Sequence, residues 1–147
     1  MWVSVLVVGW ASLGAGIRLG ARYVGLATRL LEMTVAYAKS WTALGALLKE
    51  RPSVQRMLAE MKVQIESSRW LVYHAAWLAD KQGASRESVA EVRLATGDML
   101  SRATDLMTMV YGGPSPSPEI ELHRYIKSVI PMEALEFGKN HARTTIS

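Results

Sequence analysis

Histidines and a glycine-rich stretch are the first features of this sequence whose types and spacing could carry chemistry. None of His74, His123 and His141 has a glutamate three residues earlier, so the Glu-x-x-His pattern of a di-iron bundle is missing. His74 lies among large apolar residues in WLVYHAAWLAD, which favours an interfacial or core histidine over a ligand. The run GAGIRLG (14–20) lacks the spacing of a dinucleotide fingerprint, so its glycines are better explained by helix packing. The residues alone predict no metal site and no catalytic group.

Composition limits the possible classes further. The chain has 147 residues and no cysteine, which excludes disulfides, thiol catalysis and Cys-ligated zinc or iron–sulfur clusters. Its length suits one domain with its own core. Half of the residues are hydrophobic and the mean hydropathy is +0.10, which favours a helical domain that keeps apolar surface for a partner.

The net charge of +4 is concentrated near the N-terminus. Residues 1–49 hold five of the 17 Lys and Arg residues but only one acid, Glu32. A nucleic-acid surface needs a denser basic stripe with interleaved aromatics, so we expect no nucleic-acid binding.

The first 17 residues, MWVSVLVVGWASLGAGI, carry no charge. This is shorter than the roughly 20 apolar residues that a membrane span needs, and no basic residue precedes it as in a signal peptide. We therefore expect residues 1–15 to form an apolar N-terminal segment and residues 16–147 to form the folded domain. A bundle held at a membrane, or a targeting segment, is the alternative.

Helical periodicity organises the rest of the chain. We predict helices over about 16–39, from Pro52 to about 81–83, and from about Ser85 to Gly112. The apolar stripes of these helices are Val24, Ala27, Leu31, Val35 and Ala38; Val54, Met57, Leu58, Met61, Ile65, Ser68, Val72 and Ala75; and Val89, Val92, Ala95, Met99, Leu106 and Val110. Long helices joined by short turns predict an antiparallel bundle.

The last part of the chain predicts a fourth, shorter helix. GGPSPSP (112–118) cannot be helical because its prolines favour extended or turn conformations. Residues 119–129 suit a helix that Pro131 interrupts, and a weaker helical tail follows from about Met132. No strand pattern is present after residue 10. We predict an all-α, antiparallel up-and-down four-helix bundle.

Three segments carry a resemblance to a known family. LLEMTVAYAKS (30–40), RMLAEMKVQIESSRWLVYHAAWLADK (56–81) and DMLSRATDLMTMVYGG (98–113) resemble the C-terminal helical domain of acyl-CoA dehydrogenases. The resemblance covers about residues 17–147, and we expect this chain to lack the N-terminal helical and β-barrel domains of complete members. It implies FAD as cofactor, acyl-CoA thioesters as substrate, and a glutamate that removes the α-proton while the flavin accepts a hydride.

The resemblance also implies functional positions, most of which are substituted here. In the family, the connector after the first helix carries an arginine that faces the FAD pyrophosphate of a neighbouring subunit; Trp41 stands at this position. Gly45 and Leu48 of that motif are retained, whereas Leu44 replaces a phenylalanine. The matched cofactor positions are Trp41, Leu44, Gly45, Gly112 and Gly113, and ALEFGKN (134–140) offers Glu136 as the counterpart of the catalytic glutamate. We expect the apolar connector to make an apolar contact in place of a phosphate clamp.

The sequence leaves two main functions open. In the first, the chain takes part in FAD-dependent α,β-desaturation of acyl-CoA only together with missing domains or a partner chain. In the second, it is a non-catalytic oligomerisation or scaffold module derived from that domain. In either case we expect a homo- or hetero-oligomer formed through helical faces and no turnover by the chain alone. The expected compartment is the cytoplasm, or the mitochondrial matrix in a eukaryote.

Overall fold

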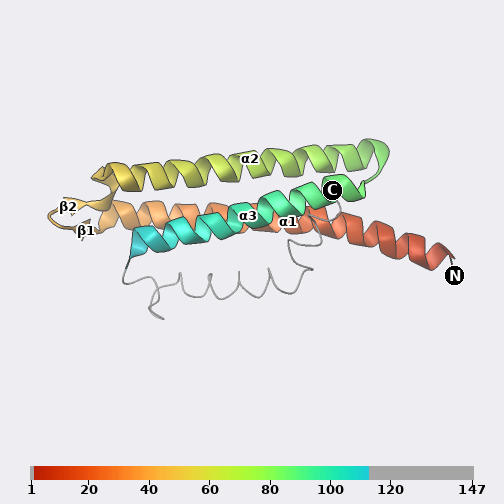
Figure 1. Ribbon diagram of the computed structural model, residues 1–147, viewed down its shortest axis with the longest axis horizontal. Helices are drawn as coiled ribbons and strands as arrows, with labels where there is room; N and C mark the ends of the chain where they lie inside the picture. Colours follow the sequence, from red (N-terminus) through yellow and green to blue (C-terminus); the bar gives the residue numbers. More distant parts are fainter. Residues whose placement is uncertain (1, 113–147) are drawn as a thin grey trace.

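The computed structural model of the chain describes residues 2–112, with side chains from Gly14 onward. Three long helices lie side by side, and a small hairpin joins the first two at one end of the bundle (Figure 1). The elements are α1 (Trp2–Ser40), β1 (Thr42–Ala43), β2 (Ala46–Leu47), the 3-10 helix η1 (Leu48–Glu50), α2 (Pro52–Gln82) and α3 (Arg86–Tyr111). The all-α prediction is confirmed, and the predicted fourth helix lies outside the described residues. A two-residue strand pair interrupts the helices where no strand was predicted.

Helix α1 begins earlier than the sequence predicted. It runs without a break from Trp2, so the predicted start near Gly16 was wrong. The glycines that suggested a helix start are interior residues, because Gly16 and Gly20 are packed against α3. The division of the chain at residue 15 stays a prediction. Within the described residues, no helix is both long and apolar enough to span a bilayer.

Helix α2 begins and ends as predicted. Pro52 occupies its first turn, where a missing backbone N–H costs nothing. Gly83 ends it with a φ of 86°, and its N–H donates to the Ala79 carbonyl at 3.1 Å. Six positions of the predicted stripe are buried, whereas Met57 and Leu58 are half-buried. These six are Val54, Met61, Ile65, Ser68, Val72 and Ala75.

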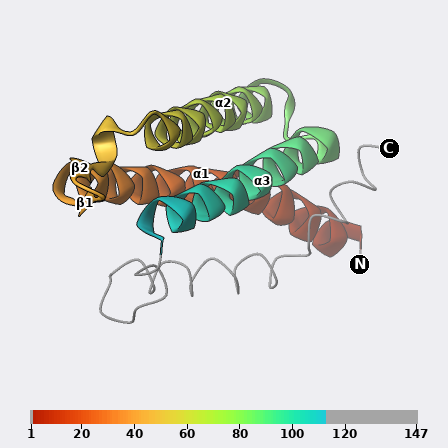
Figure 2. The same cartoon turned by 60° about the vertical axis from the view of Figure 1, so that its left-hand side comes forward.

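Helix α3 has the predicted caps. The Ser88 N–H donates to the Ser85 side-chain oxygen at 3.0 Å, and the Ser88 hydroxyl donates to the Ser85 carbonyl at 3.1 Å. At the other end Gly112 has a φ of 65°, and its N–H donates to the Thr108 carbonyl at 2.9 Å. The predicted stripe is buried except for the half-buried Ala95. Figure 2 shows α3 crossing over α1 at an angle.

The core lies where the three helices meet. Its largest fully buried side chains are Leu30, Met61, Ile65, Leu100, Leu106 and Met107. Thr34 and Thr96 are also fully buried, and each hydroxyl donates to the carbonyl four residues earlier at 2.7 Å, so neither leaves an unpaired donor. The stripe predicted for α1 was off by one residue in places, since Leu30 and Thr34 are buried whereas Leu31 and Val35 are half-buried.

The glycines of α1 allow a direct test of this packing. A Cβ at Gly20 would lie 2.4 Å from Cγ1 of Val92, a β-branched side chain that is stiff in a helix. We expect Gly20→Ala to lower the free energy of unfolding by about 1 kcal/mol or more, because strain from overpacking outweighs the gain in helix propensity. The measurement is urea denaturation followed by circular dichroism.

Gly25 provides the matched control on the same helix. A Cβ there would meet no atom within 4 Å, and the residue is exposed. We expect Gly25→Ala to raise the free energy of unfolding by about 0.5–1 kcal/mol. Equal effects of the two substitutions would contradict close packing of α1 on α3.

Candidate functional site

The connector between α1 and α2 is a tight hairpin. Thr42 pairs with Leu47 and Ala43 with Ala46, which leaves Leu44 and Gly45 as a two-residue turn. Both turn residues have positive φ, 51° and 79°, as a type I′ turn requires. Glycine adopts this conformation freely, whereas Leu44 incurs a cost on the order of 1 kcal/mol. Leu44 therefore has a strained backbone conformation at the tip of the hairpin.

This leucine is turned to solvent in the described structure. The side chain of Leu44 is 94% exposed, and the neighbouring Trp41 is 48% exposed. Leu48, at the base of the hairpin, is buried, and its N–H donates to the Trp41 carbonyl at 3.0 Å. The hairpin is thus anchored at its base and presents two large apolar groups outward.

Three stacked aromatic rings support the hairpin. Tyr37 stacks on Trp41 with ring centroids 5.4 Å apart, and on Tyr111 of α3 with centroids 4.0 Å apart. The Tyr111 hydroxyl donates to the Met33 carbonyl at 3.3 Å. This aromatic stack joins the end of α1, the start of the hairpin and the end of α3. Gly112 follows Tyr111 directly, so it lies at the same end of the bundle as the hairpin (Figure 1).

Arg51 ties the hairpin to the start of α2. Its guanidinium Nη2 donates to the Ala43 carbonyl, and its Nε is buried without a hydrogen-bond partner among the described residues. A pyrophosphate needs charge-assisted donors, for which arginine has a planar fork. Arg51 donates through Nη2 to the hairpin backbone, and Trp41 has a single neutral N–H. The exposed cations flanking the hairpin are Lys39 and Lys49. The hairpin residues therefore do not fit a dinucleotide pyrophosphate grip.

Most of the matched cofactor positions lie together. Trp41, Leu44 and Gly45 are on the hairpin, and Gly112 is at the adjacent end of α3. Gly113 and Glu136 lie outside the described residues. The sequence did not assign roles to Tyr37 and Tyr111. Trp41 directly follows the end of α1, and its four-residue spacing from Tyr37 was the available signal for their stacking.

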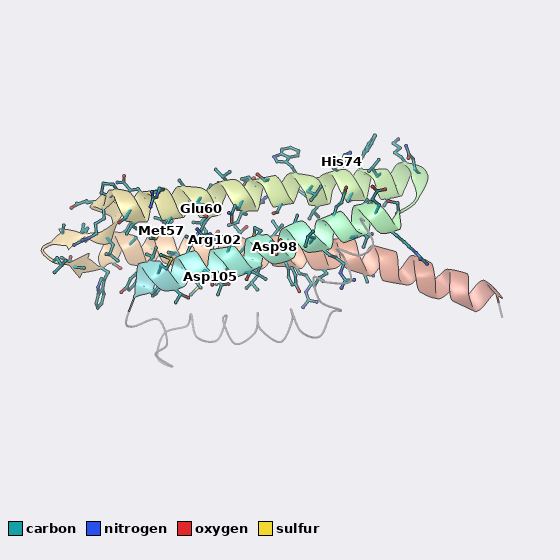
Figure 3. The ribbon with its side chains drawn as sticks, in the orientation of Figure 1. Met57, Glu60, His74, Asp98, Arg102 and Asp105 are labelled. Atoms are coloured by element: carbon teal, nitrogen blue, oxygen red, sulfur yellow. The ribbon has the colours of Figure 1, made fainter. Side chains whose placement is uncertain are left out.

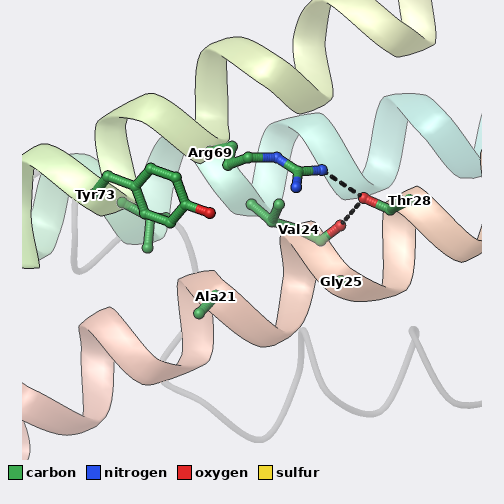
Figure 4. A pocket seen from close by; sticks show the side chains of 7 residues that line it. Ala21, Val24, Gly25, Thr28, Arg69 and Tyr73 are labelled. Atoms are coloured by element: carbon green, nitrogen blue, oxygen red, sulfur yellow. Dashed lines mark hydrogen bonds between the residues drawn. The ribbon is translucent and has the colours of Figure 1, made fainter.

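A shallow groove of about 280 Å³ lies between α1 and α2 (Figure 4). Ala21, Val24, Gly25 and Thr28 of α1, together with Arg69, Val72 and Tyr73 of α2, line it. Arg69 donates to the Thr28 hydroxyl at 3.1 Å, and that hydroxyl donates to the Val24 carbonyl at 2.7 Å. Arg69 and Thr28 thus bind each other across the helix pair, which favours a structural role for these two residues.

A second groove, of about 350 Å³, lies between α2 and α3. Beside it, Arg102 of α3 reaches Glu60 of α2 at 2.7 Å, and Figure 3 shows these two residues between the helices. Both side chains are partly exposed, so this ion pair contributes little stability. Neither groove contains a matched cofactor position, so the hairpin end of the bundle, which holds Trp41, Leu44 and Gly45, is the best candidate for a functional site.

Comparison with known proteins identifies the family. A family model described as "Acyl-CoA dehydrogenase, C-terminal domain" matches residues 15–146. The chain is 29% identical over 134 residues to "Probable acyl-CoA dehydrogenase YngJ" of Bacillus subtilis (strain 168). The matched region covers 91% of this chain and 35% of that protein.

Solved structures agree in fold. The structure of butyryl-CoA dehydrogenase from Megasphaera elsdenii matches with a TM-score of 0.84 and 26% identity, over 91% of this chain and 35% of the other. A structure of PigA with FAD and proline matches with a TM-score of 0.83 and 25% identity, over 91% and 35% of the two chains.

The described helices therefore form the helical C-terminal domain fold of acyl-CoA dehydrogenases. The chain belongs to the acyl-CoA dehydrogenase family and spans about a third of the length of the relatives named above. The resemblance expected from the sequence is confirmed.

The geometry of the aromatic stack can be tested through the hydroxyls of Tyr37 and Tyr111. The Tyr37 hydroxyl is buried without a partner among the described residues, whereas that of Tyr111 has one. We expect Tyr111→Phe to lower the free energy of unfolding by about 0.5–1.5 kcal/mol and Tyr37→Phe to leave it unchanged or raise it. Urea denaturation of both variants at neutral pH measures the difference, and a larger loss for Tyr37→Phe would contradict this geometry.

Tyr37 also has a pH signature. Burial raises the pKa of the Tyr37 hydroxyl, so the folded chain keeps this proton to higher pH than the unfolded chain. Its contribution to stability is complete below about pH 10 and is lost as pH rises through the raised pKa. We expect Tyr37→Phe to reduce the fall in stability above pH 10 relative to the unsubstituted chain.

Proposed function

We propose that this chain takes part in FAD-dependent α,β-desaturation of acyl-CoA thioesters as the helical portion of a larger assembly. The other domains of the family, in the same protein or in a partner chain, complete the site. The family match over residues 15–146 supports this proposal, since a domain of this type forms one wall of such a site. A single wall cannot enclose a flavin, so we expect the isolated chain to be inactive.

The hairpin end of the bundle is the wall that we propose faces the completed site. Trp41, Leu44, Gly45 and Gly112 lie together there, and these are the positions at which the family resemblance implies cofactor contact. The exposed Trp41 and Leu44 supply an apolar contact. Because the hairpin does not fit a pyrophosphate, the hydrogen-bond donors for the pyrophosphate come from the domains or the partner chain that complete the site. Glu136 remains the candidate general base of this proposal.

A non-catalytic scaffold is the second candidate. The observation that favours it is the replacement of the family's arginine by Trp41, together with the engagement of Arg51 by the hairpin backbone. In this case the hairpin would bind protein surface through Trp41 and Leu44. Both candidates include an oligomer, and we propose the cytoplasm, or the mitochondrial matrix in a eukaryote, as the compartment.

One purification separates the two candidates. The chain is prepared alone and mixed with a candidate partner that carries a β-barrel of this family, and bound flavin is measured by visible absorbance. If the catalytic proposal holds, the chain alone binds no flavin and shows no acyl-CoA-dependent flavin reduction. The mixture binds flavin, and acyl-CoA reduces it. A stable, colourless complex in the mixture supports the scaffold. Flavin reduction by the single chain contradicts the proposal that other parts are required.

Restoring the family's arginine tests the role of the hairpin. In a flavin-binding mixture, we expect Trp41→Arg to tighten FAD binding about tenfold, the effect of one added charge-assisted hydrogen bond. Thr42→Arg is the matched control, because it places the same charge on the same exposed hairpin one residue away. Equal tightening by both variants would indicate a general charge effect and would contradict a specific pyrophosphate position at Trp41.

A further inference from the structure

The groove between α1 and α2 combines an apolar lining with one cationic side chain. Most of its lining residues present only aliphatic groups or bare backbone, and these are Ala21, Val24, Gly25 and Val72. The polar lining residues are Thr28, Arg69 and Tyr73. Its volume of about 280 Å³ is close to the lower end of the range for small-molecule pockets, about 300 Å³. The groove therefore has room for a small ligand that is apolar over most of its surface.

The structural contact between Arg69 and Thr28 uses one nitrogen of the guanidinium and fixes the orientation of the whole group. Nη2 donates to the Thr28 hydroxyl at 3.1 Å. Among the described residues Nη1 has no acceptor, and Nε is buried without a hydrogen-bond partner. Figure 4 shows the guanidinium extending from α2 toward α1. The Arg69 side chain is only 31% exposed, so it attracts an anion more strongly than a fully hydrated cation would.

The charges around Arg69 can balance one further negative charge. Nε of Arg69 lies 3.5 Å from the Glu66 carboxylate, an ion pair without a hydrogen bond. Glu66 accepts its hydrogen bond from Lys62 instead, at 2.7 Å. Two cations and one carboxylate leave a single positive charge, which suits a singly charged ligand better than a doubly charged one. A carboxylate has this charge, and guanidinium N–H groups are well suited to hydrogen-bond it.

Tyr73 supplies a second hydrogen-bond donor beside Arg69. It follows Arg69 by four residues on α2, so the two side chains share one side of the helix. Trp70 contacts its ring edge-to-face, with centroids 5.8 Å apart. Figure 4 shows the Tyr73 hydroxyl turned toward the part of the groove where Arg69 lies. A guanidinium and a phenol can together donate to the two oxygens of one carboxylate.

We propose that this groove binds a small monocarboxylate with a short aliphatic body, such as hexanoate. Nη1 of Arg69 and the Tyr73 hydroxyl donate to the carboxylate, and the aliphatic body covers Val24 and Val72. Gly25 leaves space for this body, because a Cβ at Gly25 would meet no atom within 4 Å. Apolar contact supplies binding free energy, and the charge-assisted hydrogen bond fixes the orientation of the ligand.

This site is separate from the candidate site at the hairpin. Thr28 lies roughly 20 Å before Trp41 along the helix axis, at 1.5 Å per residue. Neither flavin nor a partner chain takes part in the carboxylate site, so the chain alone can bind the ligand. Carboxylate binding is measured on the isolated chain and flavin binding on the completed assembly, so failure of one proposal is distinguishable from failure of the other.

The first experiment titrates hexanoate into the isotopically labelled, full 147-residue chain and follows the backbone amide signals. We expect saturable shifts centred on residues 21–28 and 69–73, with a Kd on the order of 1 mM. Hexanamide has nearly the same shape without the charge, and sulfate is a dianion without an apolar body. We expect each of them to bind at least tenfold more weakly. Equal affinity for either compound, or no saturable shift with hexanoate, overturns the proposal.

The second experiment substitutes the cation. We expect Arg69→Gln to weaken hexanoate binding at least tenfold, because it removes the charge-assisted donor. Arg56→Gln is the matched control, since Arg56 is an exposed cation on the same helix and does not line the groove. We expect this control to leave the affinity unchanged, and circular dichroism verifies that both variants keep their helices. Equal weakening by the two variants means that net charge alone attracts hexanoate, which overturns the proposal.

The third experiment fills the groove without removing a charge. Gly25 is exposed and lines the groove, and leucine favours a helix more than glycine does. We expect Gly25→Leu to keep the chain at least as stable as the unsubstituted one and to weaken hexanoate binding at least tenfold. This variant keeps the test decisive if Arg69→Gln loosens the helix pair through loss of the Thr28 contact. Unchanged affinity in a folded Gly25→Leu chain overturns the proposal.

Discussion

The close approach of α1 to α3 is the constraint on which the rest of the molecule depends. Gly16 and Gly20 lack the side chains that would hold the two helices apart, and Val89 and Val92 of α3 occupy that space. This contact fixes the course of α3 along α1. At the far end it brings Tyr111 onto Tyr37, and through Tyr37 it supports the hairpin. The position of the candidate site therefore follows from helix packing about five turns away.

We propose that the hairpin keeps the shape of a family site while its chemistry differs. Gly45 and the buried Leu48 preserve the turn and its base, so the backbone still projects from the bundle. The resemblance implies an arginine where this chain has Trp41, and Arg51 donates to the hairpin backbone. The exposed Trp41 and Leu44 give the hairpin an apolar surface, which is compatible with a partner that completes the site or with a protein contact.

The sequence predicted α2 and α3 well because local signals define their limits. Pro52, Gly83 and Ser85 each act within one turn of the residues they cap, and the stripes between them keep one period.

The prediction from sequence failed at the start of α1, where interior glycines resemble a helix boundary until α3 is placed beside them. The positive φ of Leu44 was also beyond local reasoning, because leucine rarely adopts it. The pairing of Tyr37 with Tyr111, 74 positions along the chain, depends on tertiary structure alone. The sequence did place the matched positions from 41 to 45 on one connector, whereas Gly113 and Glu136 lie outside the described residues.

The central claim is that this bundle presents an apolar contact at the hairpin and does not itself grip a flavin dinucleotide. Titration of FAD into the isotopically labelled chain, followed by the backbone amide signals of residues 41–45 and the Trp41 indole N–H signal, tests it most directly. We expect these signals not to move. Saturable shifts confined to the hairpin and to Gly112 would contradict it.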